Sequence, residues 1–83
     1  MNNKILVLVY VPLIEANYDI YIPTTKKIGS VKKLITDIVI SESDGAFNKN
    51  TCKLYDKLTG DVFDENQYVK QSSIVNGTKL ILY

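Results

Sequence analysis

Two of the side chains that enzymes often use for catalysis, histidine and cysteine, are scarce in this sequence. It has no histidine and a single cysteine, Cys52. Without histidine, neither a Ser-His-Asp nor a Cys-His arrangement can form, and metal sites built on imidazole are excluded as well. Lys53 could activate the neighbouring thiol, but side chains alternate along a strand, so an exposed Lys53 turns Cys52 inward. We therefore expect a buried, unreactive thiol, no enzyme activity, no cofactor and no metal.

Acidic residues gather near Gly60, at Asp56, Asp61, Asp64 and Glu65. A calcium loop needs ligands at alternating positions and a closing bidentate glutamate, and the spacing of these four does not supply that pattern. Gly60 is a lone turn glycine, so no phosphate-binding loop is predicted. We expect the four acids to be solvated turn residues.

Length and charge narrow the function further. The chain has 83 residues, of which 46% are hydrophobic and 23% charged, which predicts a single folded domain over residues 1–83. The sequence contains ten basic residues, all of them lysine, and nine acidic residues, which gives a net charge of +1. The near-neutral charge and the absence of arginine, with its bidentate guanidinium, disfavour nucleic-acid binding.

Cellular location is suggested by two further observations. A lone cysteine cannot form an internal disulfide, which is typical of proteins in the cytoplasm. The apolar run Ile5–Ile14 is about ten residues long, which is too short to span a bilayer, and it lacks the cleavage site of a signal peptide. We expect a cytoplasmic protein that does not insert into the membrane.

A β-hairpin is predicted in the first quarter of the sequence. Lys4–Val11 is rich in β-branched residues, ends before Pro12 and is apolar on both alternating faces, which indicates a strand inside a sheet. A short connection, Leu13–Ala16, leads to a second strand, Asn17–Pro23. In this strand one face carries Tyr18, Ile20 and Ile22, and the other carries Asp19 and Tyr21.

From Ile28 the apolar period changes to three and four, through Val31, Leu34 or Ile35, Ile38 and Val39. This pattern predicts an amphipathic helix of about three turns. Its start could be Ile28 itself, or a cap at Ser30 or Thr25. A polar loop, Ser41–Asn50, should follow the helix.

The rest of the sequence predicts short strands and one long connection. Strands are expected at Thr51–Asp56 and Asp61–Phe63 around the Gly60 turn, and Asp64–Ser73 should wrap one end of the sheet. That connection should carry Tyr68, Val69 and Ile74 toward the core. The pair Asn76-Gly77 supplies a tight turn before the last strand, Thr78–Tyr83.

Together these elements predict an α+β fold, in which one helix covers one face of a mixed sheet of four to five strands. The last strand must bury Leu80 and Leu82, and its best partner is the apolar first strand. The first and last strands would then be parallel and central, which is the β-grasp arrangement.

This pattern resembles ubiquitin-like proteins over essentially the whole chain. The matching segments are the helix opening Ile28–Lys32, the strand Lys53–Tyr55 and the ending Ile74–Leu82. Within that group the sequence is most similar to the small bacterial proteins YukD and EsaB, which also end in an Ile, an Asn-Gly or Asp-Gly pair and a short apolar strand. Here the match is carried by Ile74, Asn76, Gly77, Leu80 and Leu82.

The resemblance implies a cytoplasmic accessory or regulatory component of the type VII (WXG100, Esx-like) secretion system, acting by non-covalent contact with a protein of the secretion machine. It leaves assembly, regulation and cargo delivery open. The alternative is a ubiquitin-like modifier or a sulfur carrier. Both need a mobile diglycine end, and the sequence instead reads Leu82-Tyr83, so a C-terminal extension absent here would be required.

The predicted binding site is the sheet face that points away from the helix. If Leu54, Leu80 and Leu82 point inward, alternation turns Tyr55, Ile81 and Tyr83 outward, and ubiquitin-like proteins bind partners through the matching positions. One face of the first strand must also be exposed, either Leu6, Leu8 and Tyr10 or Ile5, Val7 and Val9. This apolar surface predicts a protein partner or weak homodimerisation, unless the loops Pro12–Ala16 or Lys49–Thr51 cover it.

Lysines gather at the predicted helix, at Lys26, Lys27, Lys32 and Lys33. They could contact an acidic partner or inner-leaflet lipid near a membrane machine. The simpler interpretation, which we prefer, is the ordinary polar face of a helix.

Overall fold

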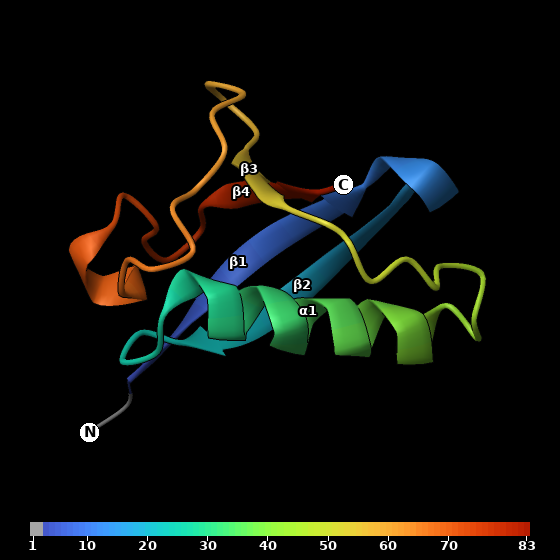
Figure 1. Cartoon of the computed structure of the whole chain (residues 1–83), viewed down its shortest axis with the longest axis horizontal. Coiled ribbons are helices and arrows are strands. Elements are labelled where there is room, and N and C mark those ends of the chain that lie inside the picture. The colour runs from blue at the N-terminus through green and yellow to red at the C-terminus, as the bar shows by residue number, and fades with distance from the viewer. Residues whose placement is uncertain (1–2) are drawn as a thin grey trace.

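The computed structural model describes residues 3–83, and in this range one helix packs on one face of a four-stranded sheet (Figure 1). The sheet order is β2-β1-β4-β3, with β1 and β4 parallel and the two outer pairs antiparallel. The prediction of an α+β β-grasp fold with parallel, central first and last strands is confirmed. The elements are β1 Lys4–Val11, β2 Ala16–Pro23, α1 Ile28–Glu42, β3 Leu54–Asp56 and β4 Lys79–Leu82, with 3-10 turns η1 Pro12–Ile14 and η2 Val69–Gln71.

The predicted hairpin is formed by β1 and β2. Their register pairs Lys4 with Pro23 at one end and Val11 with Ala16 at the other. The connection is the 3-10 turn η1 followed by Glu15, which has a left-handed backbone with φ of 50°. The amide of Glu15 donates to the carbonyl of Pro12 at 3.2 Å, which closes the turn.

The Asn76-Gly77 pair attaches the start of β4 to β1. The Leu6 amide donates to Oδ1 of Asn76 at 2.8 Å, and the Gly77 amide donates to the Leu6 carbonyl at 2.7 Å. Gly77 has a φ of +88°, which a residue with a Cβ rarely adopts. The asparagine side chain thus continues the hydrogen bonding of the parallel strands ahead of their first paired residues, Leu8 and Lys79.

Helix α1 begins at Ile28, which was one of the predicted starts, and the proposed caps at Ser30 and Thr25 are wrong. Its N-cap residue is Lys27, which makes no side-chain capping bond. Backbone from the long connection takes that role, because the Ile28 amide donates to the carbonyl of Gln67 at 2.9 Å and the Gly29 amide to that of Glu65 at 2.9 Å.

The helix is also longer than predicted. It has 15 residues, about four turns rather than three, and so includes the start of the predicted polar loop. No helix within residues 3–83 is long and apolar enough to cross a membrane.

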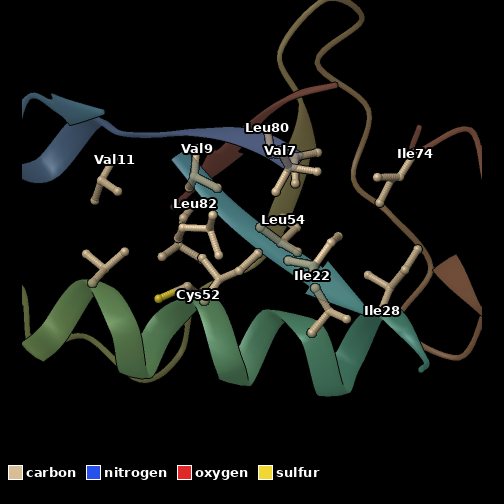
Figure 2. Packing of buried hydrophobic residues seen from close by; sticks show 14 of the residues in the cluster. Val7, Val9, Val11, Ile22, Ile28, Cys52, Leu54, Ile74, Leu80 and Leu82 are labelled. Carbon is tan, nitrogen blue, oxygen red and sulfur yellow. The ribbon is translucent and has the colours of Figure 1, made fainter. Parts of the chain in front are cut away.

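The core lies between α1 and the sheet, and Figure 2 shows the inward side chains of all four strands. In β1 the inward set is Val7, Val9 and Val11, each 0% exposed, which decides which face of this strand packs under the helix. In α1 it is Ile35 rather than Leu34 that is buried. Phe47 is 1% exposed, so the supposedly polar loop after α1 in fact contributes the largest fully buried side chain.

The predicted strands on either side of Gly60 are longer than the observed ones. The first, expected from Thr51, is confined to Leu54–Asp56. The second is absent as a strand, because residues 61–63 make only a single bridge, between Val62 and Tyr55. Two backbone hydrogen bonds flank it, from the Phe63 amide to the Leu54 carbonyl and from the Asp56 amide to the Asp61 carbonyl.

The long connection wraps one end of the sheet, as predicted, and buries Val69 and Ile74. Tyr68 was also expected in the core, but its side chain is 39% exposed. Its backbone bridges to Lys27, and the Lys27 ammonium lies 5.8 Å from its ring centroid, so the ring packs at the surface.

Candidate protein-binding face

The sheet surface opposite α1 is rich in apolar side chains, and we call it the outer face. Strand alternation and register assign its members, because residues that are paired across strands point to the same side. The pairs Leu6–Tyr21, Tyr10–Ile81 and Tyr55–Ile81 connect all four strands on this side. Its apolar members are Leu6, Leu8, Tyr10, Tyr21, Tyr55, Val62, Ile81 and Tyr83.

The structure brings the three predicted site residues together on the outer face. Tyr55 and Ile81 are direct partners in the antiparallel β3–β4 register, and both are half-buried. Tyr83 follows β4 and is held by two backbone hydrogen bonds with Lys53, of 3.0 and 3.1 Å. Its side chain is 51% exposed. Their placement agrees with the expected orientation, and their role in binding a partner stays a prediction.

Lysine side chains lie over two rings of the outer face. The Lys57 ammonium is 5.0 Å from the ring centroid of Tyr10, and the Lys49 ammonium is 4.7 Å from that of Tyr83. Each such cation–π contact contributes roughly 0.5–1 kcal/mol at an exposed site. The loop around Lys49 therefore covers part of Tyr83, as one interpretation of the sequence proposed, but half of that side chain remains accessible.

Several members of the outer face were not among the predicted site residues. Tyr21 is 62% exposed, and its outward direction was readable from the alternation of β2. Val62 is 53% exposed and reaches the face through its bridge with Tyr55, a pairing of single residues that leaves no repeating pattern in the sequence. Outside the outer face, Leu58, at 86% exposed, and Val75, at 61%, lie in turns where no periodicity could assign a direction.

A shallow hollow of about 350 Å³ borders the outer face where the turn after β3 meets the turn before β4. Leu58 and Val75 supply exposed apolar side chains there, and Lys79 lies at the boundary with the outer face. The hollow could receive one apolar side chain of a partner, and its lining carries charges of both signs, from Lys79 and Asp56.

The acids near Gly60 serve turns and one ion pair. Oδ1 of Asp56 accepts the Leu58 amide at 2.8 Å, and Oδ1 of Asp64 accepts the Asn66 amide at 2.9 Å. The prediction of solvated acids needs correction at Glu65, because its carboxylate pairs with the Lys32 ammonium at 3.0 Å across the helix start. No metal-binding group of three His, Cys, Asp or Glu residues occurs within residues 3–83.

Cys52 is 2% exposed, as alternation predicted, and its thiol lies 3.3 Å from the carbonyl oxygen of Lys49. Figure 2 shows its sulfur in the layer between the sheet and α1. A nucleophilic cysteine needs a partly exposed, electropositive environment. This burial instead suits a packing residue.

Comparison with known proteins gives no match to a family model or to a curated protein sequence. Solved structures do match. The ubiquitin-like domain of EccD5 from Mycobacterium xenopi superposes with a TM-score of 0.80 at 12% identity, covering 99% of this chain and 94% of that one. The chain has a ubiquitin-like fold. An archaeal ubiquitin from Caldiarchaeum subterraneum superposes on it with a TM-score of 0.69 at 11% identity, covering 95% of this chain and 90% of that one.

A ubiquitin-like fold of the same shape also occurs inside a larger assembly. A chain of the MycP5-free ESX-5 inner membrane complex matches with a TM-score of 0.81 at 12% identity. The match covers 99% of the present chain and 21% of the ESX-5 chain, so the present chain spans about a fifth of its length. At such identities the likeness establishes the fold.

Proposed function

We propose that this ubiquitin-like chain is a non-enzymatic binding module of a type VII secretion system. In this proposal it is a cytoplasmic accessory or regulatory component, similar in role to YukD and EsaB, and it acts through non-covalent contact with a protein of the secretion machine. The outer face carries the proposal, because it gathers eight apolar side chains from all four strands and their turns on one surface. Contiguous apolar surface of this kind marks protein interaction sites.

The connection to secretion is supported by two likenesses, one of sequence and one of fold. The sequence ending, with Ile74, the Asn76-Gly77 pair and the apolar β4, resembles YukD and EsaB. The fold superposes on the EccD5 ubiquitin-like domain and on part of an ESX-5 inner membrane complex chain, each over 99% of the present chain. A small module with this fold is therefore proposed to work beside the same kind of membrane machine.

The interaction is proposed to centre on Tyr55, Ile81 and Tyr83. Tyrosine is among the residues that most often contribute the binding energy of interfaces. Tyr55 and Ile81 are adjacent and anchored in strands, so they lose little conformational entropy when a partner covers them. Tyr83 extends this centre toward the end of β4.

Photo-crosslinking tests the proposal. A photoreactive phenylalanine analogue at position 83 should crosslink to a membrane component of the secretion machine in a bacterium that carries a type VII system. The same analogue at position 34, where the native Leu34 is 39% exposed on the helix side, is the matched control. Labelling that is equal from both positions, or that reaches no component of the machine, contradicts the proposal.

Substitutions then locate the face. Tyr55→Asp and Ile81→Asp should each abolish the crosslink from position 83, while Leu34→Asp should leave it unchanged. Melting followed by circular dichroism should show that the two outer-face variants stay folded, with a loss of roughly 1–2 kcal/mol in stability because aspartate is unfavourable in a strand. Because both side chains are half-buried, Tyr55→Ala and Ile81→Ala provide milder variants that should weaken the crosslink. Unaltered labelling in all four variants would place the interaction elsewhere.

A further inference from the structure

Charge is divided unevenly between the two sides of the molecule. Alternation puts Lys53 and Lys79 on the outer face, and the Lys49 and Lys57 ammonium groups lie over its tyrosine rings. With Lys4, which alternates with the inward residues of β1, the outer face and its border hold five of the ten lysines and one of the nine acids, Asp19. The net charge of the outer face and its border is therefore +4. Because the whole chain has a net charge of +1, the rest of the molecule has a net charge of −3.

The acids nearest to the outer face change this surplus little. Asp56 alternates to the inner side, and its carboxylate accepts the amides of Leu58 and Thr59 at 2.8 and 3.4 Å. Asp61 is exposed in the turn beyond β3, and counting it as part of the border lowers the surplus to +3. The outer face therefore combines apolar side chains with an excess of positive charge.

The position of these charges favours one kind of partner. Two copies of the chain cannot easily meet outer face to outer face, because five lysines on each would be brought together. Stacked nucleic-acid bases are disfavoured at Tyr10 and Tyr83, because lysine ammonium groups already lie over those rings. A partner that carries carboxylates, in contrast, would place them next to the lysines. Apolar side chains of the same partner would then cover the tyrosines and Ile81.

We infer that the outer face binds an amphipathic protein segment in which apolar side chains are flanked by aspartate and glutamate. This inference rests on the proposed function and specifies the chemistry of its partner. The apolar side chains would cover Leu8, Tyr55 and Ile81, and one could enter the hollow between Leu58 and Val75. The acidic side chains would lie next to Lys53, Lys57 and Lys79.

A peptide titration followed by amide NMR shifts tests the inference. The probe is a synthetic amphipathic peptide of leucine, alanine and glutamate, and its matched control has every glutamate replaced by lysine. The acidic peptide should shift the amides of Leu8, Tyr55 and Ile81, and raised salt should weaken its binding. The lysine peptide and single-stranded oligothymidine should produce no such shifts.

Charge reversal on opposite sides of the molecule provides the decisive comparison. Lys53→Glu combined with Lys79→Glu should weaken binding of the acidic peptide about tenfold. The reason is that two attractive surface contacts become repulsive, and each contributes a fraction of a kcal/mol. Lys26→Glu with Lys33→Glu changes the net charge equally on the helix side and should have less than a twofold effect. Equal weakening by both pairs, equal binding of the two peptides, or no binding of either peptide overturns the inference.

The failure of this inference can be told apart from failure of the proposed function. If Ile81→Asp abolishes the crosslink to the secretion machine but Lys53→Glu with Lys79→Glu leaves it intact, the function holds and the acidic partner chemistry is wrong. If oligothymidine binds the outer face instead of the acidic peptide, the partner is a nucleic acid and both proposals fail.

Discussion

Replacing Lys27 with aspartate should raise the free energy of unfolding by about 1 kcal/mol. Lys27 is the N-cap of α1, with φ of −71° and ψ of 152°, and its side chain makes no capping bond. This extended backbone suits aspartate, whose carboxylate could accept the amide of Ser30 at the third helical position. The amides of Ile28 and Gly29 are already bonded to the connection, so a single additional bond is expected.

The magnitude follows from three contributions. A capping side chain adds about 1 kcal/mol. Exchanging a positive for a negative charge at the positive end of the helix dipole adds roughly 0.6 kcal/mol, using the lower end of the range for each charge. Losing the contact of the Lys27 ammonium with the Tyr68 ring, at 5.8 Å from its centroid, costs roughly 0.5 kcal/mol. The net gain of about 1 kcal/mol corresponds to a rise in Tm of roughly 4–8 °C for a domain of this size.

Urea unfolding followed by circular dichroism measures the effect, with two further variants that separate the contributions. Lys27→Asn retains the capping acceptor without the negative charge and should gain somewhat less, roughly 0.8 kcal/mol. Lys27→Ala removes both the charge and the ring contact, so its stability should change by less than about 0.5 kcal/mol. If Lys27→Asp is less stable than the parent while Lys27→Ala is unchanged, the capping argument is refuted.

Three further substitutions or labels probe the core and the β1–β4 junction. Leu80→Ala should lower the unfolding free energy by about 2–5 kcal/mol in urea titrations, because this side chain is 0% exposed, and a loss below about 1 kcal/mol would contradict its central place. Asn76→Ala should cost about 1 kcal/mol by removing the acceptor of the Leu6 amide, and Asn76→Asp, which keeps an acceptor, should cost less; equal losses would refute this role. Cys52 should react with an aromatic disulfide reagent much more slowly in buffer than in urea, and equal rates would show that the thiol is accessible.

Alternation of apolar and polar residues predicted which side chains of a strand are buried wherever one face of the strand was polar. In β2 the alternation of Ile20 and Ile22 with Asp19 and Tyr21 determined which residues are buried. β1 was different, because both of its faces are apolar and the sequence alone could not choose between Val7, Val9 and Val11 and their neighbours. The choice is made by the hairpin register, which sets Val7 opposite Ile20 and so joins the two inward faces.

Contacts between distant segments explain most of what the sequence did not predict. The helix start depends on carbonyls of Glu65 and Gln67, so a search for a local capping side chain at Ser30 or Thr25 was bound to fail. Phe47 is buried because the loop after α1 folds back on the core, although most residues of that loop are polar. In the outer face, Tyr55, Ile81 and Tyr83 were found by alternation, whereas Val62 joins it through one bridge formed across a turn.

The parallel pairing of β1 with β4 has a consequence for synthesis of the protein. The first strand, β1, leaves the ribosome early, but its parallel neighbour β4 is missing until residues 79–82 have emerged from the exit tunnel. During that interval the apolar β1 has only the hairpin partner β2, and its free edge could pair with other nascent chains. A ribosome-bound chaperone that shields this edge would therefore be expected to increase the yield of folded protein.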